Sequence, residues 1–195
     1  LMANKILNTE MDDTPPQLAF ANFAGDFSPT AANDLRKGTD TEVELVLLNL
    51  ADAAAAQSAK GDLGANFAAE YSLVACIEMQ VAAADAGGIV EFYWNASPSA
   101  TAATANMGAA SGSAEAYSGY SSDLSESVQQ LIFIGSMVMT NDAVDSAQIG
   151  YVGSLFPPHR HGSLIVKNEC GQTICDTDDI EAHVVLNPII PEVQD

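Results

Sequence analysis

The sequence contains three histidines, two of which flank Arg160. His159 and His161 lie in the segment 157–162, which begins with two prolines. Residues at positions i and i+2 of a strand share a face, so these imidazoles could bind a metal with His183. We favour a proline turn followed by a polar strand start, with Arg160 paired to a carboxylate, and we expect no metal or other cofactor. Arg160 is then also a candidate inter-subunit contact, because it is one of only six cations.

The three cysteines cannot all be paired within one chain. Cys170 and Cys175 flank a turn between two expected strands. A disulfide there would stabilise the fold by roughly 2 kcal/mol. We favour reduced thiols and leave the disulfide open. A zinc site is disfavoured, because the two cysteines have only scattered histidines to complete four tetrahedral ligands.

The carboxylates offer two further kinds of site. Residues 176–181 resemble half of a calcium loop but lack its glycine and its distant glutamate, so we interpret them as a solvated acidic turn. Glu42 with Glu44, or Glu70 with Glu78, could form a glycosidase pair. The nucleophile-elbow, phosphate-loop and zinc-protease motifs are all absent from the sequence. We therefore expect a protein that is not an enzyme and has no catalytic residues.

The elements that would position these groups are mostly strands. Alternation of apolar and polar residues, or a continuous apolar run, indicates a strand. Such patterns occupy residues 41–50, 70–81, 90–95, 131–139, 148–156, 163–167 and 182–186, and the run at 131–139 is typical of a central strand. Residues 53–56 could form a short alanine helix. A second short helix is expected near 122–129, with Ser122 as N-cap.

At least seven strands joined by long connections indicate an all-β protein. The sequence predicts an antiparallel β-sandwich with a jelly-roll-like or Greek-key path and long small-residue loops at 51–69 and 97–122. An immunoglobulin-like sandwich is the second choice. The spacing of Cys76, Trp94 and Cys170 does not fit the cysteine–tryptophan–cysteine pattern of that fold.

The first forty residues differ from the rest of the chain because their apolar residues do not recur with the period of a strand or of a helix. We expect an extended N-terminal arm at 1–40, a sandwich domain at 41–187 and an extended C-terminal tail at 188–195. Phe20, Phe23 and Phe27 are the candidate anchors of the arm. Such an arm packs on its own domain or on a neighbouring copy, or else remains partly unfixed, because ordering it needs a large apolar area.

The charge excludes several partners. The chain has 195 residues with 26 acidic and 6 basic side chains, a formal net charge of −20, and no lysine or arginine from Gly61 to His159. Nucleic acid and anionic membranes both select clustered cations, so neither is expected as a partner. Charged residues are only 16% of the chain, which favours a surface that contacts neighbours over wide areas.

Three segments carry a resemblance to a known class of proteins. Residues 92–101, 130–135 and 156–166 resemble virion proteins of tailed bacteriophages, and more narrowly the small decoration or cement proteins of their capsids. The similarity covers roughly the C-terminal two thirds. It implies a β-rich structural protein on the outer surface of an icosahedral virion, made in the host cytoplasm. It also implies a homo-oligomer, a trimer rather than a dimer, that binds across neighbouring major capsid subunits.

A carbohydrate-binding or host-adhesion module on the same sandwich is the alternative function. Such sites expose aromatic rings beside polar groups, and Tyr93, Tyr117 and Tyr120 are the candidates. A polysaccharide-degrading enzyme is the third interpretation, with Glu70 and Glu78 as its carboxylates.

Overall fold

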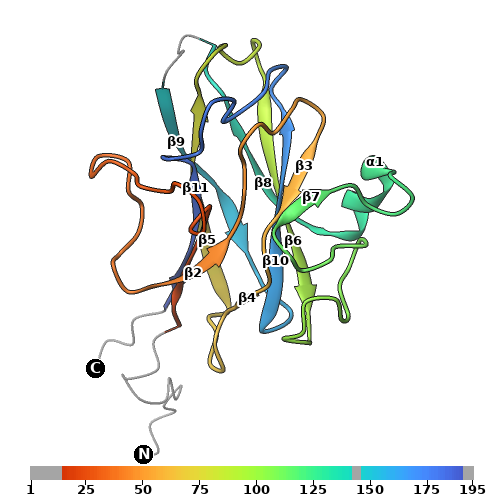
Figure 1. Cartoon of the computed structure of the whole chain (residues 1–195). Coiled ribbons are helices and arrows are strands. Elements are labelled where there is room, and N and C mark those ends of the chain that lie inside the picture. Colours follow the sequence, from red (N-terminus) through yellow and green to blue (C-terminus); the bar gives the residue numbers. More distant parts are fainter. Residues whose placement is uncertain (1–14, 142–145, 191–195) are drawn as a thin grey trace, which may run out of the picture.

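The computed structural model describes residues 15–141 and 146–190, and in that part the protein is all-β. One α-helix and one 3₁₀-helix accompany eleven strands within the described residues (Figure 1). The strands are β1 Gln17–Ala21, β2 Asp40–Glu44, β3 Ala55–Gln57, β4 Gly61–Asp62, β5 Glu70–Met79, β6 Ile89–Ser97, β7 Glu115–Tyr117, β8 Ile132–Val138, β9 Ser146–Leu155, β10 His161–Glu169 and β11 His183–Ile189. The helices are α1 Leu124–Ser127 and η1 Val128–Gln130.

The strands form one large sheet that curls over on itself. Its order is β2-β1-β11-β5-β9-β8-β6-β10-β3-β7, with β4 added beside β10. The rings of Phe20 in β1 and Trp94 in β6 lie five strand positions apart in this order. Their centroids are nevertheless only 6.4 Å apart, in an edge-to-face contact. The two halves of the sheet therefore face each other across a shared core, as in a sandwich.

The chain path is that of a folded-over hairpin. Strand β8 pairs with β9, β6 pairs with β10, and β5 pairs with β11, so that each antiparallel pair encloses the previous one in sequence. The predicted all-β, sandwich-like fold is thus confirmed, and this nesting is in keeping with the expected jelly-roll-like path. Strands β1 and β2 are parallel, which is the exception to the antiparallel order.

Two apolar cores lie on opposite sides of the β6–β10 pair. The main core fills the sandwich and includes Trp94, Tyr71, Phe20 and Phe92, all fully buried. A smaller core lies on the outer side of β6 and β10, under the segment that carries β7, α1 and η1. It contains Ala55, Tyr93, Ala110, Tyr117, Val128, Leu131 and Ile165. Residues that alternate along β6 thus enter different cores, because successive side chains of a strand point to opposite faces.

Seven of the strands were predicted at nearly their observed positions, but some local predictions were wrong. Residues 53–56 do not form a helix, because Ala53 adopts the left-handed conformation (φ 59°) and Ala55 begins β3. The strand predicted at 41–50 ends at Glu44. The N-cap of α1 is Asp123 rather than Ser122, since the Asp123 side chain accepts a hydrogen bond from the Glu126 N–H.

The structure places both expected terminal extensions partly in the sheet. Strand β1 pairs with β11 and β2, N-terminal to the domain boundary expected at residue 40. All five of its residues are buried, so it shows no alternation that a sequence pattern could reveal. In β11, Pro188 lies opposite Tyr71 of β5. It lies beyond Leu186, the last β11 residue that pairs with β1, so on that side Pro188 has no neighbouring strand among the described residues. An edge position of this kind tolerates the missing proline N–H.

Helices contribute little to this fold. The α-helix found in the described ranges, α1, has four residues. No helix among those residues is long and apolar enough to span a membrane.

Candidate functional site

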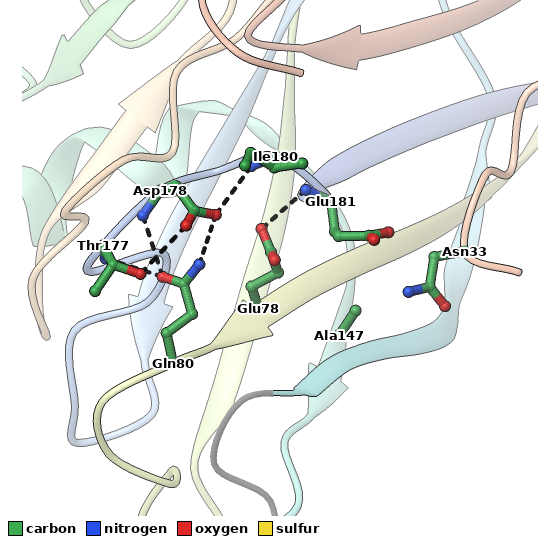
Figure 2. Close-up of a pocket in the computed structure, with 8 residues that line it drawn as sticks. All are labelled: Asn33, Glu78, Gln80, Ala147, Thr177, Asp178, Ile180 and Glu181. Carbon is green, nitrogen blue, oxygen red and sulfur yellow. Dashed lines mark hydrogen bonds between the residues drawn. The ribbon is translucent and has the colours of Figure 1, made fainter. Parts of the chain in front are cut away.

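An acidic pocket lies where the end of β5 meets the turn before β11. Figure 2 shows Glu78 of β5 and Gln80, which directly follows that strand, beside the turn 177–181, with Asn33 and Ala147 on the opposite side. Its volume is about 400 Å³. Of the carboxylates that the sequence singled out at 176–181, Asp178 and Glu181 line this pocket, together with Glu78.

Glu78 is the most strongly perturbed carboxyl in this pocket. Its side chain is almost fully buried, and Oε2 accepts a hydrogen bond of 3.0 Å from the Glu181 N–H. Burial raises the pKa of Glu78 to about 7, and the nearby carboxylates of Asp178 and Glu181 add to the rise. Glu78 is therefore poised to exchange a proton near neutral pH.

The acidic turn beside Glu78 is held by hydrogen bonds to protein groups. Gln80 donates through Nε2 to Asp178 Oδ1 at 2.8 Å, and its Oε1 accepts the Thr177 N–H at 2.9 Å. Asp176 Oδ1 accepts the Val81 N–H. Across residues 15–141 and 146–190, no group of three or more His, Cys, Asp or Glu side chains converges as metal ligands. The turn thus has the hydrogen bonding of a structural loop.

Glu70 and Glu78, named above as a possible glycosidase pair, are too far apart to act as one. The two residues are at opposite ends of β5, eight residues apart, which corresponds to roughly 27 Å at 3.4 Å per residue. Carboxyl groups that cleave glycosides lie about 5–9.5 Å apart. Glu42 and Glu44 lie in β2, where Glu42 faces Arg36 and Glu44 accepts the Ala24 N–H. Neither lines the acidic pocket.

The structure does not bring the histidines together. His183 is buried in β11, where its Nε2 accepts the Leu35 N–H at 3.0 Å, and burial lowers its pKa. His161 begins β10 and lies 3.7 Å from Asp62, while His159 is exposed in the turn before it. Of His159 and His161, only His161 is in β10, so the alternative in which the two imidazoles share a strand face does not form, and the favoured turn before the strand start is what the structure has.

The cysteines are all buried and unpaired in the described part of the chain, as the favoured interpretation had it. Burial raises the pKa of each thiol. Buried thiols with raised pKa values make poor nucleophiles.

The proposed contact residues have partners within the chain. Phe20 is fully buried in the main core, which corrects its assignment as an exposed anchor. Phe23 and Phe27 are half-buried with ring centroids 5.1 Å apart, and the Arg36 guanidinium lies 4.9 Å from the Phe27 centroid. Arg160 is half-exposed and forms a bidentate pair with Asp62, with both N–O distances 2.6 Å. The arm phenylalanines thus pack on their own domain.

Two of the three tyrosines expected to form a sugar platform are buried. Tyr93 and Tyr117 belong to the outer core, and the Tyr117 hydroxyl donates to the Gly108 carbonyl. Tyr120 alone of the three is exposed. The predicted platform is therefore wrong.

An exposed apolar surface, which was not predicted from the sequence, lies on β8, on β9 and at the residue directly after β9. We call this surface the apolar face, and its residues are 45–66% exposed: Phe133, Val138, Ile149, Tyr151 and Phe156. The signal was present in the sequence. A continuous apolar run such as 131–139 places apolar side chains on both faces of a strand, and only one face can enter the core.

Beside this face, β8 and β9 separate and leave a groove. Within the described residues the two strands pair at one position, Gly135 opposite Gly153. Beyond it lies a groove of about 480 Å³, which we call the β8–β9 groove. Its lining includes Met137, Val138, Thr140, Gln148, Ile149 and Tyr151, and none of the described lining residues is charged.

No family model, no curated protein and no solved structure matches this chain.

Proposed function

We propose that this protein is a structural component of an assembly and works by binding other protein copies through its apolar face. The observation that supports this is the set of five large apolar side chains exposed on β8, on β9 and at Phe156 directly after β9. Extended exposed apolar patches mark interaction surfaces on soluble proteins. Three of the five are aromatic, and aromatic residues are enriched where proteins contact each other.

The charge distribution supports the same proposal. With a net charge of −20, free copies repel one another over most of their surface. The apolar face and the β8–β9 groove offer a place where a neighbour can dock without burying an unpaired carboxylate. Repulsion elsewhere on the surface would restrict docking to this side.

We propose further that the assembly is a tailed-bacteriophage capsid, on whose outer surface this protein acts as a decoration protein. This part rests on the resemblance of residues 92–101, 130–135 and 156–166 to such proteins. These segments include residues of β8, β6 and β10, which are adjacent in the sheet. The proposed partner is the major capsid protein, and the proposed oligomer is a trimer that has no catalytic role.

The experiment replaces Tyr151 and Phe156 together by Ser and measures sedimentation velocity and co-sedimentation with empty tailed-phage shells. The intact protein should associate with itself and with the shells, and the double variant should bind at least tenfold more weakly. Val81→Ser is the matched control, because Val81 is as exposed as Val138 but lies at the end of β5, outside the face.

Two results would overturn the proposal. One is an intact protein that stays monomeric and ignores the shells. The other is millimolar or tighter glycan binding in calorimetry that is lost in the same double variant, which would favour the carbohydrate-binding alternative.

A further inference from the structure

The β8–β9 groove exists because two strands cross closely at one point and then diverge. A Cβ on Gly135 would overlap the Val152 carbonyl oxygen, and one on Gly153 would overlap the Ile134 carbonyl oxygen. Only glycine permits this approach of two backbones. Beyond the crossing, β8 continues its pairing with β6 and β9 continues its pairing with β5, so among the described residues each has an edge toward the groove with no strand paired to it.

Backbone groups of β8 point into this groove. A strand directs its N–H and C=O groups alternately to its two sides. The Met139 N–H donates to the Gly88 carbonyl on the β6 side, so the backbone groups of Val138 are directed to the side of β9. At Thr140 the Gln148 side chain takes the place of a strand, since its Oε1 accepts the Thr140 N–H at 2.9 Å. A side-chain amide carries the same groups as a peptide bond.

These features select an extended peptide as the occupant. Main-chain hydrogen bonds to free strand edges give affinity in strand addition, and neighbouring apolar side chains give specificity. Ile149 and Tyr151 supply apolar contacts beside the free edges. An occupant must be weakly charged or positive, because the groove itself is uncharged and the protein around it carries a net charge of −20.

Residues 1–14 lie outside the described residues, and the first nine of them have this chemistry, whereas the next five include Glu10, Asp12 and Asp13. The first nine include Lys5, Ile6 and Leu7 and no Asp or Glu, so they form a positive, partly apolar stretch in a strongly acidic protein. Fully extended, fourteen residues reach roughly 46–50 Å. That length accommodates a strand of about five residues and a linker to a neighbouring molecule.

The position of β1 favours a groove on another copy. Gln17 is near the level of Asn187, which pairs with Ser72 at the start of β5, whereas the groove lies toward the other end of β5. To reach its own groove the segment would have to cross β11, β5 and β9. A neighbouring copy can present its groove directly.

We propose that residues 1–14 of one copy add a strand in the β8–β9 groove of a second copy and so link the copies. This inference rests on the proposed function, because it names the contact by which copies are joined. Residues 1–14 would then anchor one copy to the next. The arm phenylalanines would not, because they pack within their own domain.

The test uses two full-chain variants and their mixture. The arm variant carries Ile6→Ser and Leu7→Ser, and its control carries Asn4→Ser and Asn8→Ser. The groove variant carries Val138→Ser and Ile149→Ser. In sedimentation velocity, each test variant alone should lose self-association at least tenfold, while the control should not.

The mixture decides whether the strand is exchanged between copies. Each variant retains one intact half of the contact, so an equimolar mixture should form a heterodimer, and hydrogen exchange at 136–140 should slow on mixing. A mixture that stays monomeric would overturn the inference, as would an arm variant that associates like the intact protein. If the Tyr151 and Phe156 double variant still abolishes shell binding in that case, the proposed function stands and only the strand addition fails.

Discussion

Two neighbouring parts of the same sheet differ in the extent of their strand pairing and in whether their outer face is covered. Strands β6 and β10 pair from His161 opposite Ser97 to Glu169 opposite Ile89, and the protein covers their outer face with its own β7 and α1 segment. Strands β8 and β9 pair at one described position, and their outer apolar residues remain exposed. The difference teaches that an apolar outer face is not itself a defect in this fold. The outer face of β6 and β10 is buried by another segment of the same chain. The outer face of β8 and β9 is exposed, and it is the candidate binding surface for a partner.

The half-buried Lys60 and the buried Glu78 are also held by different numbers of hydrogen bonds. On the covered side, the Lys60 ammonium donates to four oxygens, those of Ser97 Oγ and the Ser99, Thr101 and Thr104 carbonyls, at 2.8–3.0 Å. Burial still lowers the pKa of Lys60. Glu78, which pairs with Ala147 at the start of β9, accepts a 3.0 Å bond from the Glu181 N–H. Lys60 therefore has more hydrogen-bond partners than the Glu78 carboxylate.

The largest expected effect compares one tyrosine from each part. Tyr117→Ala should lower the free energy of unfolding by about 3–4 kcal/mol, because it empties the outer core and removes the hydrogen bond to Gly108. Tyr151→Ala should change it by no more than about 0.5 kcal/mol, because Tyr151 is exposed. Urea unfolding measures both. Similar losses for the two variants would remove the distinction between covered and bare faces.

A second prediction concerns the lysine that organises the covering loop. Lys60→Met should lower the free energy of unfolding by roughly 2–3 kcal/mol, because three carbonyls and a hydroxyl lose a charged donor. Hydrogen exchange should accelerate at 97–104. Lys37→Met, at an exposed lysine in another loop, is the control and should stay within about 0.5 kcal/mol of the parent. Unchanged exchange at 97–104 would show that the loop is held by other contacts.

The third prediction is a pH dependence of stability caused by Glu78, whose stated size is an upper limit. The folded-state pKa of Glu78 is about 7, raised from 4.5, so the folded protein retains a proton that the unfolded chain has released. Stability from this group should therefore fall as pH rises from about 4.5 to about 7, by at most about 3 kcal/mol. In Glu78→Gln this fall should disappear, while the acceptor for the Glu181 N–H is kept.

The control for this experiment is Glu70→Gln, which removes the same charge at the opposite end of β5. Urea unfolding at pH 5 and pH 8 measures the difference for all three proteins. If the two variants reduce the pH dependence equally, the effect belongs to net charge rather than to the burial of Glu78.

Much of the strand content follows from local pattern, but the candidate surface does not. The alternation in β5, from Tyr71 to Met79, marks a strand with one face in the core, and the structure has it there. The five buried residues of β1 carry no such alternation, so the strand was missed and Phe20 was assigned to an arm. The local sequence also does not predict the partners of Phe23, Phe27 and Arg160. An aromatic ring or a cation can pack on its own chain or on a neighbouring copy, and the sequence pattern is the same in both cases.

The sequence by itself determined an all-β protein with a strong negative charge, seven of its strands and the absence of common catalytic motifs. These follow from composition and from the period-two repeat, which are local properties. The tertiary structure alone decided which apolar residues are covered. Tyr93 and Tyr151 both lie in predicted strands, yet the first is buried under a loop distant in sequence and the second is exposed. The physical reason is that burial depends on strand order and on long connections, and one strand's own residues do not encode what packs above it.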